Sequence, residues 1–231
     1  MKNNLKTIFM LLTLLLVAAT TNAQISTTAS NVWGQSDFST GTANPTQSGM
    51  NRPTSIAIDE AHRKVYVADN FYHRVLRFSL DSIEVNNPQA EIVFGQTDFV
   101  SVLANRGTTA DNNTLSSPSA VAVDANGNLY IADKNNHRVL RFNNANLINS
   151  NGPAANAIFG QVDFTTVTFG NTNIKMRNPQ GLGLDNDTLY VAEENNNRVI
   201  KFKSASQVTT NPTADTVFGQ STFSTGSANQ G

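Results

Sequence analysis

Two histidines in this 231-residue chain lie beside residues that could make them reactive. Each follows a carboxylate by four residues and directly precedes an arginine: Asp69, His73 and Arg74 in one segment, and Asp133, His137 and Arg138 in the other. A histidine paired with a carboxylate can act as a general base, and a neutral imidazole can bind a metal ion. Carboxylates and guanidiniums in this order could also face a charged ligand.

A third copy of the pattern argues for a structural role. It has Glu193 and Arg198 in the same places, but Asn197 where the histidine would be. Asparagine can hydrogen-bond in a turn, but it cannot act as a general base. A catalytic residue is normally unique to one copy of a repeat, whereas a residue that the fold requires recurs. We therefore expect the histidines to be turn residues, and the carboxylates to accept N–H groups of the turns and to pair with the arginines.

Other candidate groups give weaker signals. Asp59, Asp124 and Asp185 each end an apolar segment and could supply oxygen ligands to calcium if they converged. His62 lies alone in an expected turn, where we expect it to be exposed. The chain has no cysteine, and no serine-hydrolase elbow, phosphate-binding loop or zinc-protease motif occurs. We assign no catalytic residue and no metal ligand.

Composition limits the fold class and the partners. Asn, Thr and Ser make up 74 of the 231 residues, and these types favour turns and strand edges over helix interiors. An all-β protein is therefore expected rather than a helical bundle. The 16 basic and 17 acidic residues give a net charge of −1, so the charge balance predicts no nucleic-acid partner.

Residues 1–23 have the composition of a signal peptide. Lys2 and Lys6 precede an apolar stretch from Ile8 to Ala19, and a small-residue cleavage site ends at Ala23. A retained anchor is the alternative, but the stretch is shorter than the ~20 residues that a membrane-spanning helix needs. We expect a secreted, periplasmic or cell-surface protein that has no membrane attachment after cleavage, and whose residues 24–231 form the fold.

Three segments of the chain align with one another, at residues 51–79, 117–143 and 178–203. A second motif, which contains Gly-Gln and ends in phenylalanine, occurs four times, at Val32–Phe38, Val93–Phe99, Ile158–Phe164 and Val217–Phe223. Inside each segment apolar residues alternate with small or polar ones, which predicts strands rather than helices. Each segment therefore predicts three short antiparallel strands, and each Gly-Gln motif predicts a fourth, outer strand.

These segments resemble the NHL repeats of β-propeller proteins. The resemblance is carried by the acidic residue, the His-Arg-Val or Asn-Arg-Val step and the preceding Tyr-Val-Ala or Tyr-Ile-Ala strand, with an upstream proline. It implies an NHL-type β-propeller of three four-stranded blades plus an extra N-terminal outer strand at Val32-Trp33. Three blades are fewer than the four that usually close a ring. We therefore expect part of a larger propeller of about six blades, or a homodimer that closes one.

Each Gly-Gln motif makes two further predictions. Its glycine should adopt positive φ to turn the chain out of the sheet, at Gly34, Gly95, Gly160 and Gly219. An aromatic residue follows three positions after the glutamine and should pack between blades, at Phe38, Phe99, Phe164 and Phe223.

The long connections between the repeats differ most from one another and are the expected binding surface. They carry four basic residues outside the repeated pattern, which we take as candidate ligand-binding residues: Arg52, Arg106, Lys175 and Arg177. We expect a non-enzymatic scaffold without a cofactor that binds a protein or glycan partner through these loops. The alternative, implied by resemblance to six-bladed propeller enzymes, is a metal-dependent lyase or hydrolase that uses calcium or zinc.

Overall fold

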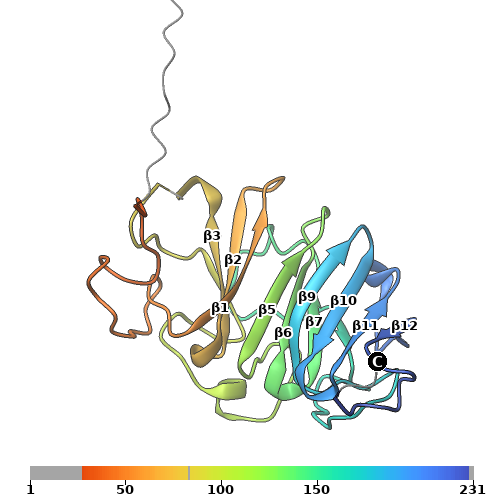
Figure 1. Cartoon of the computed structure of the whole chain (residues 1–231). Helices are drawn as coiled ribbons and strands as arrows, with labels where there is room; N and C mark the ends of the chain where they lie inside the picture. The colour runs from red at the N-terminus through yellow and green to blue at the C-terminus, as the bar shows by residue number, and fades with distance from the viewer. Residues whose placement is uncertain (1–27, 83, 229–231) are drawn as a thin grey trace, which may run out of the picture.

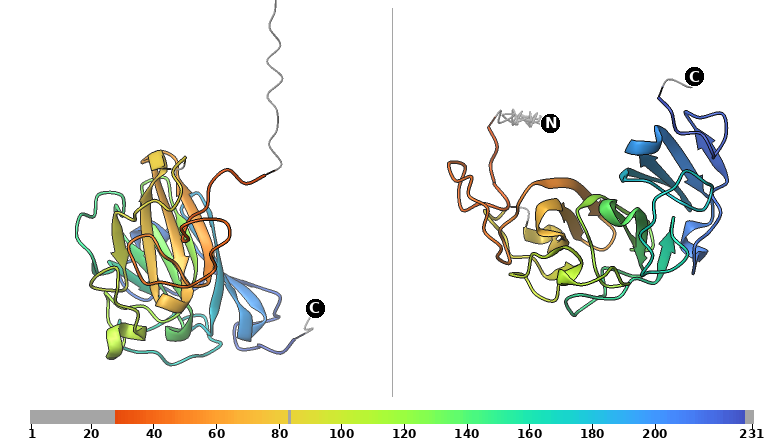
Figure 2. Two further views of the ribbon diagram at one scale, coloured as in Figure 1. Left: turned by 90° about the vertical axis from the view of Figure 1, so that its left-hand side faces the viewer. Right: turned by 90° about the horizontal axis from the view of Figure 1, so that it is seen from below.

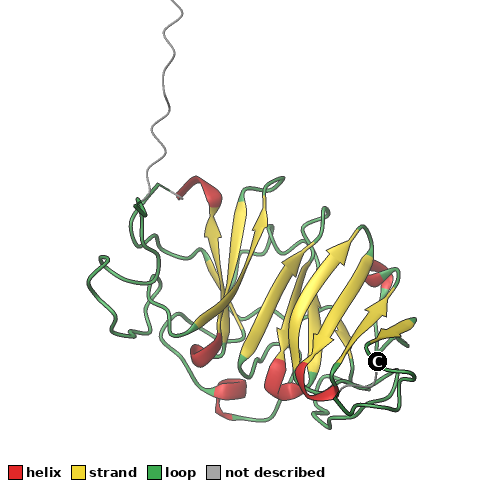
Figure 3. Ribbon diagram, viewed as in Figure 1, coloured by secondary structure: helices red, strands yellow, loops and turns green. Residues whose placement is uncertain are grey.

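The computed structural model describes residues 28–82 and 84–228, so the expected signal peptide lies outside the described residues. Within them, twelve strands form three antiparallel sheets of four strands each, and the helices are short 3-10 turns (Figures 1 and 3). No helix in these ranges is long and apolar enough to cross a membrane. The predicted all-β fold with three four-stranded blades is confirmed.

Each sheet takes its strands in chain order, from an inner strand to an outer one. Blade 1 consists of β1 (Pro53–Asp59), β2 (Lys64–Asp69), β3 (Arg74–Ser79) and β4 (Ile92–Phe94). Blade 2 consists of β5 (Pro118–Val123), β6 (Leu129–Asp133), β7 (Arg138–Phe142) and β8 (Ala157–Phe159). Blade 3 consists of β9 (Pro179–Asp185), β10 (Thr188–Glu193), β11 (Arg198–Phe202) and β12 (Thr216–Phe218). The three repeats of the sequence therefore fold with one topology.

The turn between the second and third strands has the same backbone in each blade. A single 3-10 turn follows the acidic residue, and the next residue is left-handed, with φ of 51° at His73, 55° at His137 and 50° at Asn197. Asparagine and histidine are among the few non-glycine residues that tolerate this region. The backbone therefore restricts the residue type here independently of any contact that the side chain makes.

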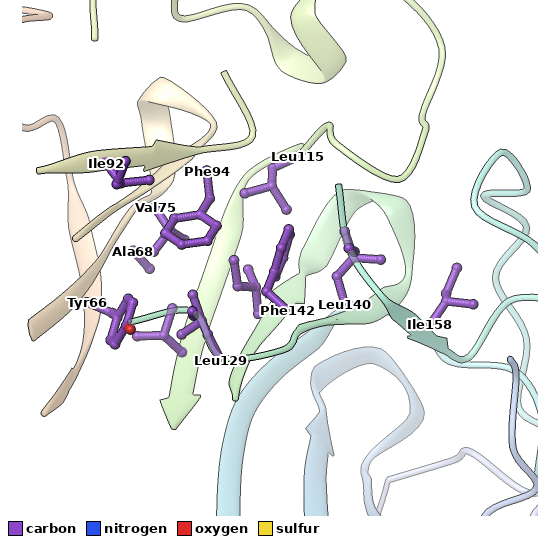
Figure 4. Packing of buried hydrophobic residues seen from close by; sticks show 14 residues of the cluster. Tyr66, Ala68, Val75, Ile92, Phe94, Leu115, Leu129, Leu140, Phe142 and Ile158 are labelled. Atoms are coloured by element: carbon purple, nitrogen blue, oxygen red, sulfur yellow. The ribbon is translucent and has the colours of Figure 1, made fainter. Parts of the chain in front are cut away.

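The blades follow one another along an arc and pack face to face (Figure 2). Between blades 1 and 2, Phe94 of β4 meets Phe142 of β7 edge to face, with ring centroids 5.1 Å apart (Figure 4). Between blades 2 and 3, Phe159 of β8 meets Phe202 of β11 at 5.3 Å. The two interfaces are therefore built alike, and each buries an apolar cluster drawn from both blades.

The glycine of each Gly-Gln motif turns the chain out of its outer strand, as predicted. The φ angle is 86° at Gly95 and Gly160 and 83° at Gly219. A Cβ atom at Gly160 would also come within 2.6 Å of the Met176 side chain. Both the backbone and the packing therefore require glycine at this position.

The expected extra outer strand at Val32-Trp33 is not a strand in the structure. The Val32 N–H donates to Asn86 Oδ1 at 3.0 Å, and the Val32 carbonyl accepts the Asn87 N–H at 2.8 Å. A strand needs a neighbouring strand for its ladder, and no strand among the described residues lies beside this segment.

The aromatic residues after the Gly-Gln motifs divide into two groups. The predicted packing between blades is confirmed for Phe164 and Phe223, which lie against the two clusters shared by neighbouring blades. Phe99 packs against an apolar cluster that contains blade 1 but no second blade, so the prediction of packing between blades is wrong there. Phe38 is 59% exposed, so the prediction is wrong there. The N-terminal motif has no complete blade on which its aromatic residue could pack within the described residues.

Substitution of Gly160 by valine tests the role of the glycine turn. We expect Gly160→Val to lower the free energy of unfolding by about 3 kcal/mol or more, because a strained left-handed backbone and overpacking each cost roughly 1–3 kcal/mol. Urea unfolding of the purified chain measures this loss. Gly41→Val is the matched control, because a Cβ there meets nothing within 4 Å. Similar losses for the two variants would contradict the interpretation.

Candidate functional site

The carboxylate and arginine of each repeat form a buried pair. In blade 1, Arg74 Nε donates to Asp69 Oδ2 at 2.7 Å, and both side chains are fully buried. The other guanidinium N–H groups donate to the carbonyls of Thr46, Gly49 and Phe99. One guanidinium therefore holds the chain that enters the blade and the chain that leaves it, and because it is fully buried it does not face a ligand.

The other two blades repeat this arrangement. Arg138 Nε donates to Asp133 Oδ2 at 2.8 Å, and Arg198 Nε donates to Glu193 Oε2 at 2.5 Å, again without exposure to solvent. Burial raises the pKa of the Glu193 carboxyl, and the guanidinium of Arg198 opposes that rise. The predicted structural role of these residues is confirmed, and they do not face a ligand as a charged ring.

The two histidines connect successive blades. His73 Nδ1 accepts the Ser117 N–H at 2.9 Å, and His137 Nδ1 accepts the Asn178 N–H at 3.2 Å. Each acceptor nitrogen must be unprotonated, and burial lowers the pKa of both rings, which favours that neutral form. In the third turn, Asn197 Nδ2 donates to the Gly226 carbonyl at 2.8 Å, in the chain that follows its blade. The histidines are therefore turn and linking residues, as the comparison of the repeats predicts.

The three aspartates considered as calcium ligands serve their own turns instead. Asp59 accepts the N–H of His62 at 3.1 Å and contacts its ring nitrogen at 2.9 Å, so His62 is only partly exposed. Asp124 accepts the backbone N–H groups of Asn126 and Asn128, both at 2.9 Å. In residues 28–82 and 84–228, no group of three or more His, Asp or Glu side chains is placed to hold a metal ion.

The four basic candidates have different surroundings. Arg106 donates to the carbonyls of Gly95 and Gly152, so its guanidinium is engaged within the protein. Lys175 Nζ lies 3.2 Å from Thr168 Oγ1. The remaining two each lie over a phenylalanine ring, Arg52 over Phe71 at 4.9 Å and Arg177 over Phe169 at 4.7 Å. The structure therefore does not gather the four into one site.

A groove at the loop-bearing end contains one of the four, Arg177. Its volume is about 640 Å³, and Phe169, Asn171 and Asn195 line it together with residues 224–227. The Phe169 ring is 59% exposed, and its edge-to-face contact with His137 has centroids 5.6 Å apart. An exposed ring, a guanidinium and side-chain amides thus meet in one hollow, which makes this groove the candidate binding site.

Sequence reasoning found Arg177 but missed Phe169. One Gly-Gln motif follows blade 1 and another follows blade 2. The glutamine of the first, Gln96, donates from Nε2 to the Leu103 carbonyl, and the glutamine of the second, Gln161, donates to the Thr168 carbonyl. Leu103 and Thr168 are therefore structural equivalents. Phe169 therefore corresponds to Ala104, an alanine in the earlier connection. An aromatic residue that breaks the repeat is the signal that could have identified this position.

The fold and its repeated arginine–carboxylate turns define the blades as those of a β-propeller. Residues 115–142, which contain β5, β6 and β7, match the family model of the NHL repeat. The second blade is therefore an NHL repeat, and the first and third blades share its topology and its buried pair.

Comparison with solved structures shows distant similarity. A luciferin-regenerating enzyme has 14% identity and a TM-score of 0.40, over 64% of this chain and 39% of that chain. The hydrazine synthase of Kuenenia stuttgartiensis has 12% identity and a TM-score of 0.44, over 77% of this chain and 38% of that chain. This chain thus covers less than half the length of either protein. A search of the curated proteins found no match.

We predict that asparagine can replace either histidine. His73→Asn and His137→Asn should each lower the free energy of unfolding by less than ~1 kcal/mol, because asparagine accepts the left-handed turn and retains a hydrogen-bonding group, as Asn197 does. Urea unfolding measures the change. His73→Val is the control, since a β-branched residue suits neither requirement and should cost more. A loss above about 3 kcal/mol for either asparagine variant would contradict the prediction.

The same histidines predict a pH dependence of stability. Their pKa values are lowered in the folded chain, so the unfolded chain binds protons first as the pH falls. Their contribution to stability should be complete above the unfolded-state pKa of about 6.5 and should be lost as the pH falls through the folded-state values. Urea unfolding between neutral and weakly acidic pH measures this slope, which should be smaller in the double variant His73→Asn/His137→Asn. An unchanged slope in that variant would assign the effect to other groups.

Proposed function

We propose that this chain is an exported, non-enzymatic scaffold that binds a partner through the loop-bearing end of its blades. The observation that carries the proposal is the groove in which the exposed Phe169 ring lies under Arg177. The repeated charged side chains are engaged with the chain itself, whereas the Phe169 ring is exposed and the Arg177 side chain lies half-buried over it. A side chain that the fold does not need and that faces a hollow is a candidate for recognition.

A glycan is the partner class that the groove chemistry supports best, with a protein segment as the alternative. Sugar rings stack their C–H faces on aromatic rings, and their hydroxyl groups hydrogen-bond to amides and guanidiniums. The groove supplies the ring of Phe169, the guanidinium of Arg177 and the amides of Asn171 and Asn195. Arg177 would also favour sugars that carry a carboxylate.

The test compares two arginine–phenylalanine stacks in the same chain. We expect Phe169→Ala and Arg177→Ala each to weaken binding to a responsive polysaccharide at least tenfold, a loss of about 1.4 kcal/mol. Isothermal titration against a panel of neutral and uronic-acid polysaccharides measures the affinity. Phe71→Ala and Arg52→Ala are the matched controls, because they form the same kind of stack outside the groove.

Each outcome bears on the proposal. Loss of affinity confined to the groove variants would support the glycan site. Equal loss in all four variants would show that the groove is not the site. No binding of the unmodified chain to any member of the panel would reject the glycan class and leave the protein alternative.

A further inference from the structure

The two histidines of the repeated turns differ in what lies beside their rings. His73 and His137 have the same left-handed backbone, and each accepts a backbone N–H of the chain that enters the next blade. The His137 ring also meets the Phe169 ring edge to face, with centroids 5.6 Å apart. In the connection beside His73, Ala104 takes the place of Phe169 and offers no ring. His137 is therefore the histidine that touches the candidate groove.

His137 reaches Arg177 by two routes. The first is through Phe169, because the Arg177 guanidinium lies 4.7 Å from the centroid of the ring that His137 contacts. The second is through the backbone, because the N–H that donates to His137 Nδ1 at 3.2 Å belongs to Asn178, the residue directly after Arg177. A change at the imidazole therefore acts on both groove residues.

This arrangement requires a neutral imidazole. A protonated Nδ1 is a donor, so it could not accept the Asn178 N–H, and two N–H groups would then point at one another. The imidazolium would also face the guanidinium of Arg177, which carries the same charge. Both effects act against the present positions of the Asn178 backbone and the Arg177 side chain.

Two charged groups act on the His137 ring in addition to burial. Burial lowers the pKa of His137, the Arg177 guanidinium lowers that pKa further, and the Asp133 carboxylate raises it. Asp133 is held by the buried guanidinium of Arg138 and by the N–H of Ser116, so it is fixed within its own turn. Repulsion after protonation is therefore relieved by movement of Arg177 rather than by movement of Asp133.

The other charged side chains around this turn have partners of their own. Lys134 Nζ lies 2.7 Å from Glu194 Oε2, and Lys175 Nζ lies 3.2 Å from Thr168 Oγ1. At His73, burial again lowers the pKa, but the charged group that acts on the ring is a carboxylate, that of Asp133. Of the two histidines, only His137 is thus acted on by a cation of the groove.

We propose that His137 is a positioning residue of the groove, and that its protonation releases the Phe169–Arg177 stack. The inference rests on the proposed function in one respect, namely that the groove is the binding site. In the neutral form, the imidazole holds the Asn178 backbone and lies against Phe169, and protonation removes the first contact and adds repulsion toward Arg177. The groove therefore binds a neutral glycan at neutral pH and releases it as the pH falls.

NMR spectroscopy of the chain with labelled phenylalanine, arginine and histidine tests this role without any ligand. We expect nuclear Overhauser contacts between the Phe169 ring and the Arg177 side chain at about pH 8, and their loss in step with protonation of the His137 imidazole. His137→Asn should remove this pH dependence, because an amide does not titrate. His73→Asn is the matched control and should retain it, because it removes the same turn residue without touching the groove.

Three outcomes of the NMR titration would overturn the proposal. The first is contacts that persist after His137 is protonated, and the second is an equal pH-dependent loss in His137→Asn. The third is unfolding of the chain, followed by circular dichroism, before His137 takes up a proton, because His137 would then not act in a folded groove.

The coupling between His137 and Arg177 is reciprocal and can be measured from the other side. Arg177→Gln removes the guanidinium charge and should raise the pKa of His137 while the pKa of His73 stays unchanged. Arg52→Gln is the matched control, because it removes the guanidinium of the stack outside the groove and should change neither pKa. An unchanged pKa of His137 in Arg177→Gln would overturn the coupling.

Isothermal titration with a neutral polysaccharide that binds the unmodified chain measures the effect on binding. Affinity should fall about fivefold or more as the pH falls through the protonation of His137. His73→Asn should show the same fall, whereas His137→Asn should bind with an affinity that does not change with pH. A pH-independent affinity of the unmodified chain would overturn the release of the ligand. Absence of binding at every pH would reject the glycan class, and the NMR titration of the free chain would then decide the role of His137.

Discussion

One buried guanidinium in each blade holds together parts of the chain that are distant in sequence. In blade 2, Arg138 pairs with Asp133 across the β6–β7 turn, and its other N–H groups reach the carbonyls of Asp111, Thr114 and Phe164. The first two carbonyls precede the blade and the third follows its outer strand. Removing one partner of such a buried pair leaves a charge without compensation, which costs roughly 3–5 kcal/mol. The long connections therefore have fixed ends although they contain no strands.

The candidate groove depends on the same interaction in blade 3. Arg198 Nη1 donates to the Asn171 carbonyl at 3.0 Å, and Asn196 Nδ2, beside the turn, donates to the Gly170 carbonyl at 2.8 Å. These two bonds fix the backbone directly after Phe169. The Phe169 ring therefore projects from a backbone that is fixed by these two bonds, and its place beside Arg177 does not depend on the loop's own contacts alone. A surface held in this way loses little conformational freedom when a partner binds.

The sequence allows prediction of those features that each repeat determines locally. Strand alternation, the turn at His73 and the positive φ of Gly160 follow from residue type and spacing, and the structure has all of them. The extra strand at Val32-Trp33 could not be predicted in this way, since a strand exists only beside another strand. The position of Phe169 is not determined by its local sequence either, because it depends on where the connections between the blades are anchored. Sequence therefore predicted the blades well and the groove only in part.

Arg177 shows how a repeat can vary a side chain without loss of the fold. Its N–H donates to Glu193 Oε1 at 2.7 Å, as the N–H groups of Asn51 and Ser116 donate to the carboxylates of their own blades. The fold uses only the backbone of this residue, so arginine, asparagine and serine are equally compatible with the turn. The side chain is then free to vary, and in blade 3 it lies over Phe169 inside the groove. Blades of this type can therefore diverge in function at positions where the fold uses hydrogen bonds of the backbone but none of the side chain.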